Sequence, residues 1–232
     1  MNTSTMSLKT FLGRLILVVL LAIAFGYIEA AVVVYLRQIF HPNGFNFPLA
    51  AFLLSDNSRN LLTVEAAREA ATLILIFSAS LLLGQNRLQR IAYFMIIFAV
   101  WDIFYYVFLK LILDWPASVM DWDILFLIPL PWASPVLAPL LVSISLILFA
   151  AIILYRDLSA KPLKVTLWDW LGFSLAALAL IVSFCIAGRR VAQPDYAAHF
   201  YWPLFTAGLL AALAFFAKCL YNQPGPAHPS QS

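Results

Sequence analysis

Charged side chains are scarce in this sequence. Only 11% of its 232 residues are Asp, Glu, Lys or Arg, whereas 64% are hydrophobic. An ordinary soluble domain carries about 25% charged residues. A soluble fold of this size would leave much of that apolar surface exposed, in patches that drive aggregation. The composition therefore excludes a soluble protein and predicts one that lies in a lipid bilayer.

Cysteine and histidine are also rare, with two and three copies. Cys185 and Cys219 fit neither a disulfide framework nor a CxxC metal or redox site. The histidines fall at predicted helix ends or in the C-terminal tail, which argues against haem held between paired histidines. His199 and the nearby loop aspartates lack HExxH or comparable spacing, so solvation explains them better than a metal site does.

Other cofactor motifs are missing as well. The sequence has no phosphate loop and no dinucleotide fingerprint, so no nucleotide is expected. Lys218 resembles a retinal attachment site only superficially, because it lies near the inner end of the last apolar run, where snorkelling explains it. The net charge of +3 is scattered between apolar runs, which argues against nucleic acid. No nucleophile stands out, so the sequence leans away from an enzyme.

Long apolar stretches dominate what remains. Each can cross a bilayer as a helix, since about 20 residues suffice. The first is too long for a signal peptide, and we expect it to remain uncleaved. We predict an all-α, polytopic transmembrane bundle, one domain over 1–220, with a disordered tail at 221–232. Its six spanning helices are expected at about 11–36, 61–83, 88–113, 135–155, 166–187 and 200–220.

The segment 116–134, before the fourth span, breaks the helical pattern. Prolines interrupt it repeatedly, so no regular helix can pass through it undistorted. Ser134 and Pro135 resemble an N-cap followed by proline at the first helical position, so the fourth helix is expected to begin there. The tryptophans of the segment suit an interfacial depth, and Trp101 in the third span is also read as an interface anchor. The segment is expected to lie in the outer interface or to dip inward as a re-entrant loop.

Lysine and arginine are unevenly divided between the two sides of the predicted bundle. With the N-terminus inside, eight lie on the cytoplasmic side and five on the outer side, with Arg68 near the outer face. This bias predicts that both termini are cytoplasmic. The inner set is Lys9, Arg14, Arg87, Arg90, Arg156, Lys161, Lys164 and Lys218, and the outer set is Arg37, Arg59, Lys110, Arg189 and Arg190.

Carboxylates inside the predicted spans are the best functional candidates. A charge in hydrocarbon costs about 3 kcal/mol or more unless it is paired, solvated or neutralised. Glu65, Arg68 and Glu69 follow three- and four-residue spacing and share one helix face. Arg68 is expected to pair with either glutamate or to reach Glu29 or Asp102 on a neighbouring helix.

Two tyrosines lie close to Asp102 in the third span. Tyr105 and Tyr106 lie one turn beyond it, where their hydroxyls can join the same network. Together with the intramembrane charges they predict a polar pocket that opens outward. Asp121 and Asp123, in the proline-rich segment, are expected to roof this pocket.

The predicted pocket carries more negative than positive charge. Its four carboxylates outnumber Arg68, so protonation, a bound cation, or inward reach by Arg37 or Lys110 must balance them. The alternative is a satisfied ion-pair network that only pins the first three spans together, as polar groups in membranes often do. The sequence leaves both open.

Three phrases carry a resemblance to a family: Arg68-Glu69-Ala70-Ala71-Thr72, Trp101-Asp102-Ile103-Phe104-Tyr105-Tyr106 and Asp123-Ile124-Leu125-Phe126-Leu127-Ile128-Pro129. They resemble those of uncharacterised bacterial multi-pass inner-membrane proteins. The resemblance covers about the middle third of the chain. It implies a membrane location and no named activity.

Three functions remain open at this stage. The first is an acidic intramembrane pocket that binds a cation, a proton or a small polar solute, for transport or sensing. The second is a non-catalytic structural or assembly subunit of a larger membrane complex. The third is an enzyme acting on lipid at the outer leaflet, with a carboxylate as acid or base.

Overall fold

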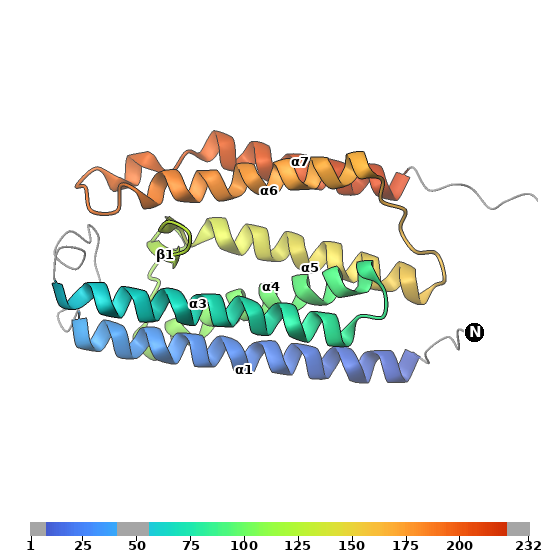
Figure 1. Ribbon diagram of the computed structural model, residues 1–232, viewed down its shortest axis with the longest axis horizontal. Coiled ribbons are helices and arrows are strands. Elements are labelled where there is room, and N and C mark those ends of the chain that lie inside the picture. The colour runs from blue at the N-terminus through green and yellow to red at the C-terminus, as the bar shows by residue number, and fades with distance from the viewer. Residues whose placement is uncertain (1–7, 41–55, 222–232) are drawn as a thin grey trace, which may run out of the picture.

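The computed structural model describes residues 8–40 and 56–221, which form six long helices and a small β-hairpin (Figure 1). All six helices are long and apolar enough to cross a membrane. The predicted all-α bundle is therefore confirmed, and the chain is a multi-pass membrane protein. The helices are α1 (Leu8–Phe40), α3 (Asp56–Leu83), α4 (Arg87–Leu113), α5 (Leu137–Leu158), α6 (Leu167–Gly188) and α7 (Trp202–Tyr221).

The expected helix boundaries differ from these by a few residues, and the differences have local causes. Asn86 caps α4, because its side chain accepts a hydrogen bond from the backbone N–H of Gln89. Thr166 and Asp169 form a capping box at the start of α6. Tyr221 still belongs to α7, so the expected tail starts one residue too early, and residues 222–232 lie outside the described part of the chain.

Lipid-facing surface dominates the helices. In each span only 22% to 39% of the most apolar stretch is buried inside the protein. Large apolar side chains such as Leu17, Leu82 and Leu175 are more than half exposed. In water such a surface would aggregate, whereas in a bilayer acyl chains cover it.

The helices form two groups. α1, α3 and α5 pack against α4, and α6 packs against α7. In Figure 1, α6 and α7 lie together beyond α5, while α1 and α3 lie on the other side. The two groups are joined at the hairpin, which contacts both α5 and α6, and by a smaller contact between α5 and α7.

The segment before α5 is a β-hairpin, which sequence reasoning did not predict. β1 (Trp122–Phe126) pairs antiparallel with β2 (Trp132–Pro135), and Asp123 lies opposite Ser134. The hairpin is partly buried: Ala133 and Ser134 are fully covered and Asp123 is 2% exposed, whereas Leu130 in the turn is 39% exposed. This protection lets non-helical backbone lie beside a membrane bundle, since its own strand pairing and the neighbouring helices satisfy its polar groups.

The predicted cap of the fourth span is wrong. Ser134 and Pro135 belong to β2, and the Ser134 hydroxyl donates to the Pro135 carbonyl at 3.0 Å instead of capping a helix. α5 begins at Leu137 after Val136, which supplies no side-chain cap. The backbone N–H of Leu137 instead donates to the carbonyl of Val119 at 2.7 Å, so the segment before the hairpin caps this helix.

Two glycines allow close approaches that hold the site together. A Cβ at Gly26 of α1 would lie 2.9 Å from the carbonyl oxygen of Trp101 in α4. A Cβ at Gly188 would overlap the backbone of Pro131, in the turn of the hairpin. Small residues at these positions bring α1 against α4 and the hairpin against α6.

We predict that Gly26→Leu destabilises the protein by about 1–3 kcal/mol, because the added side chain forces α1 away from α4. Thermal unfolding in detergent measures the effect. Gly13→Leu is the matched control in the same helix, since nothing lies within 4 Å of a Cβ there. Equal stability of the two variants would contradict the close approach.

Candidate functional site

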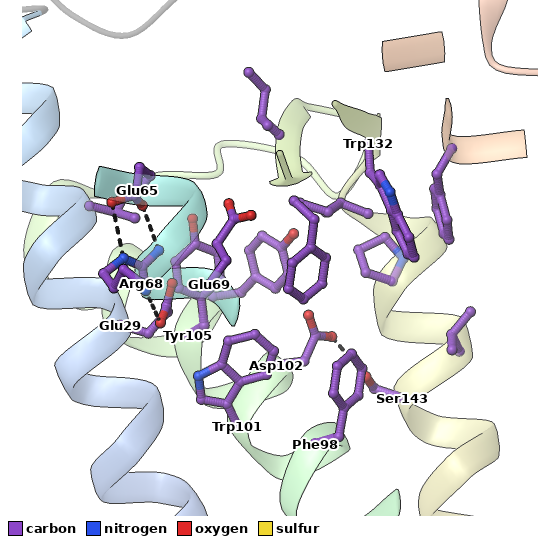
Figure 2. A pocket seen from close by; sticks show the side chains of 18 residues that line it. Glu29, Glu65, Arg68, Glu69, Phe98, Trp101, Asp102, Tyr105, Trp132 and Ser143 are labelled. Atoms are coloured by element: carbon purple, nitrogen blue, oxygen red, sulfur yellow. Dashed lines mark hydrogen bonds and ion pairs between the residues drawn. The ribbon is translucent and has the colours of Figure 1, made fainter. Parts of the chain in front are cut away.

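A cavity of about 120 Å³ lies between α1, α3, α4, α5, α6 and the hairpin (Figure 2). This volume has room for several water molecules or one small solute. All seven predicted binding or protonation residues line it: Glu29, Glu65, Arg68, Glu69, Asp102, Tyr105 and Tyr106. The structure therefore brings these side chains together, while their roles stay predictions.

Arg68 links two of the glutamates. Its Nε donates to Glu65 at 3.0 Å and its second terminal nitrogen to the other oxygen of Glu65 at 2.5 Å. Its first terminal nitrogen donates to Glu29 on α1. Figure 2 shows the guanidinium between the two carboxylates. One cation thus joins α1 to α3, and its charge is shared by two anions.

Arg37 forms a second ion pair, with Asp123 of the hairpin at 3.2 Å. The Tyr105 hydroxyl donates to the other Asp123 oxygen, also at 3.2 Å. The Arg37 guanidinium lies 3.8 Å from the centre of the Trp115 ring. Burial raises the pKa of Asp123, and the Arg37 charge opposes that rise. This pair fastens the hairpin to α1 and α4.

The expected roof of the cavity needs correction. Asp121 and Asp123 are not among the lining residues. Asp121 instead accepts hydrogen bonds from the backbone N–H groups of Ala117 at 2.7 Å and Ser118 at 3.3 Å, so it shapes a turn. The hairpin supplies apolar and aromatic lining, from Ile124, Leu125, Phe126 and Trp132.

Glu69 and Asp102 differ from the other two acids of the cavity. Glu69 accepts a hydrogen bond from the backbone N–H of Leu127 at 2.8 Å, and Asp102 accepts one from the Ser143 hydroxyl at 2.8 Å. Among the described side chains, in residues 8–39 and 60–221, neither forms an ion pair with a basic residue. Each of these hydrogen bonds uses one carboxylate oxygen, so the second oxygen can bind another partner.

The two basic residues proposed to reach inward do not balance these acids. Arg37 pairs with Asp123, and Lys110 pairs with Asp114 at 2.7 Å on the surface, where it lowers the pKa of Asp114. Four carboxylates and one guanidinium line the cavity. When all are ionised, the lining carries three more negative than positive charges, which a low-dielectric site does not tolerate without protons or bound cations.

Aromatic rings form much of the cavity wall. Trp101 is 5% exposed and lines the cavity, so its interpretation as an interface anchor is wrong. Trp101, Phe98, Phe126 and Trp132 form a chain of ring contacts with centroids 5.4–6.4 Å apart. The indole N–H groups of Trp101 and Trp132 are buried and have no hydrogen-bond partner within the described chain. Such groups are costly unless water or a solute accepts their hydrogen bonds.

Sequence reasoning missed Ser143 and the lining tryptophans. Ser143 is buried in α5 and holds Asp102, but a single serine in an apolar run gives no signal of its role. Trp101 is adjacent to Asp102 along the chain, which was the available clue. Its position near the middle of a span, rather than at an end, argues against an interfacial anchor.

Other candidate side chains lie away from the cavity. His199 pairs with Asp195 at 2.9 Å, which lowers the pKa of Asp195, and no group of three or more metal-ligating side chains occurs in the described residues. Lys218 does more than snorkel, because it pairs with Asp169 at 2.7 Å and so joins α7 to α6. Cys185 lies near the end of α6 and Cys219 near the end of α7, and neither forms a disulfide within the described residues.

We predict that Arg68→Gln destabilises the protein by about 3 kcal/mol, because it leaves Glu29 and Glu65 without their cation. Thermal unfolding in detergent at neutral pH measures the loss. Lys110→Gln is the control, since it breaks an exposed ion pair and should change stability little. An equally small loss of stability in the two variants would show that the ion pairs of Arg68 do not stabilise the contact between α1 and α3.

Comparisons with known proteins give no further identification. No protein-family model matches the chain, and neither a curated protein nor a solved structure was found that is significantly similar. The resemblance to uncharacterised bacterial membrane proteins therefore stays a prediction, and the geometry of the cavity is the basis for function.

Proposed function

We propose that this protein binds a cation, a proton or a small polar solute in the acidic cavity, for transport or sensing across a membrane. The observation that carries the proposal is that Glu69 and Asp102 line the cavity without a basic partner among the described residues. Carboxylates in such a place hold a proton or attract a cation, because an uncompensated charge is costly there.

The two kinds of polar group in the lining suit a small ligand. The free oxygens of Glu69 and Asp102 accept hydrogen bonds or bind a cation, and the buried indole N–H groups donate. The aromatic walls favour a cation through their ring faces. Arg68 is occupied by Glu29 and Glu65, so its part is to hold the geometry of the site.

The orientation belongs to the same proposal. The cavity lies in the half of the bundle that holds the hairpin, away from the turn between α3 and α4. The distribution of lysine and arginine favours the opposite end as cytoplasmic. The membrane proposed is a bacterial inner membrane, which rests on the family resemblance alone. The cavity is then nearer the outer side, where a sensor or an importer would meet its ligand.

Tryptophan fluorescence tests the binding role, because Trp101 and Trp132 line the cavity. With the protein in nanodiscs, we expect the emission to change on titration with acid, Na⁺ or methylammonium. The change should be lost in Asp102→Asn and Glu69→Gln, since neither amide is charged or titrates in this range.

Asp114→Asn is the control for that experiment, because Asp114 is exposed and lies outside the cavity. It should respond like the unmodified protein. Folded Asp102→Asn and Glu69→Gln variants with unchanged responses to all three titrants would refute the proposed site.

A structural role in a larger membrane complex is the second candidate. The same polar contacts join different elements: Glu29 to α3, Glu69 to the hairpin, Asp102 to α5 and Asp123 to α1. A scaffold subunit needs such links and no ligand. Purification in mild detergent separates the candidates, because a stoichiometric partner supports the scaffold and a monodisperse single chain supports the binding protein.

A further inference from the structure

A second hollow lies toward the other end of the bundle, where α4 begins. It is a crevice of about 570 Å³ that runs between α3, α4, α5 and α6. Its walls are largely apolar and include Phe77, Leu81 and Trp170, and Arg87 and Arg90 also line it. The volume lies within the range of about 300–1,000 Å³ that is usual for ligand pockets.

A deeper apolar cavity lies directly beside the crevice and shares part of its lining. That cavity has a volume of about 210 Å³ and reaches toward α7. Ile91, Met95, Leu146 and Trp170 line both spaces. A long, flexible apolar chain entering beside Arg87 or Arg90 can therefore extend into the interior of the bundle.

The packing of the helices explains why this space exists. The main contacts of α6 are with α7 and with β2, at the hairpin end of the bundle. Toward the start of α6, Trp170 faces the crevice shared with α3 and α4. α6 therefore has at most a slight contact with α3 and α4, which leaves the crevice between these helices.

Two arginines line the crevice near the start of α4. Arg87 and Arg90 are both exposed, in the first turn of α4, and neither forms an ion pair with a carboxylate of the described residues. The Nε of Arg90 donates to the carbonyl of Gly84 at 3.0 Å, which fixes the side chain beside the opening. The neighbouring Asp157 is occupied by Asn86 and Gln89.

We infer that the crevice binds an anionic phospholipid, with an acyl chain between α3 and α6 and the phosphate headgroup on Arg87 and Arg90. Guanidinium groups suit phosphate, because they combine charge with paired hydrogen bonds. Basic residues at a membrane surface attract anionic lipid, and a neutral lipid gains none of this attraction. The site is separate from the acidic cavity, and the inference does not rest on the proposed function.

Thermal unfolding in mixed micelles tests the headgroup contact. We expect phosphatidylglycerol to bind roughly tenfold more tightly than phosphatidylcholine, and so to raise the melting temperature at lower concentration. Arg87→Gln with Arg90→Gln should abolish the difference between the two lipids. Each variant is compared with itself in phosphatidylcholine, so a general loss of stability does not affect the result.

Arg189→Gln with Arg190→Gln is the matched control, because it removes two exposed charges from the far end of α6. It should keep the preference for phosphatidylglycerol. Equal loss of preference in both double variants, or no preference in the unmodified protein, would overturn the inference.

Fluorescence quenching tests the place of the acyl chain. Phosphatidylglycerol with brominated chains, in a phosphatidylcholine background, should quench more strongly than brominated phosphatidylcholine at the same fraction. Trp170→Phe should remove most of that excess, because Trp170 lines the crevice. Trp168→Phe is the control, because Trp168 is 75% exposed and does not line the crevice. This substitution should lower the quenching by both lipids equally. An excess that survives Trp170→Phe would place the lipid elsewhere.

Discussion

The cost of charge in hydrocarbon is the constraint on which this structure depends. The carboxylates near the hairpin are tolerable only because each has a partner from another turn or element. Arg68 serves two acids at once and ties α1 to α3, while Arg37 ties the hairpin to α1. Glu69 and Asp102 receive hydrogen bonds but no cation among the described residues, so the cavity keeps an unbalanced negative charge. This imbalance connects the architecture to a binding role.

The hairpin has a matching structural role. It is irregular backbone held among helices, and it is stable there because its strands pair with each other and its one buried acid is paired. It also forms part of the cavity wall, since Phe126 and Trp132 line the cavity, and it joins the two helix groups. Toward the start of α4 the described residues form no such element, and the apolar crevice lies there between α3, α4, α5 and α6. One bundle therefore has a half with an acidic cavity and a half with an apolar crevice that Arg87 and Arg90 line.

Much of this could be predicted from sequence, and the failures have physical causes. Apolar length is a strong signal, so every described span was predicted. Helical spacing was enough to place Glu65, Arg68 and Glu69 on one face. The cost of burying a charge was enough to predict that Glu29 and Asp102 lie in the same polar pocket. The hairpin was missed because its strands are short and lie among prolines, where turn and strand signals overlap. The roles of Trp101 and Ser143 depend on packing between distant segments, which no local pattern encodes.

The central claim is that protons or cations balance the charge of Glu69 and Asp102. Infrared difference spectroscopy of the protein in lipid measures this most directly, because protonated and ionised carboxyl groups absorb at different frequencies. The account predicts a protonated-carboxyl band that decreases when pH or cation concentration rises and that is missing from Asp102→Asn combined with Glu69→Gln. A spectrum with no titrating carboxyl band, or one unchanged in that double variant, would contradict it.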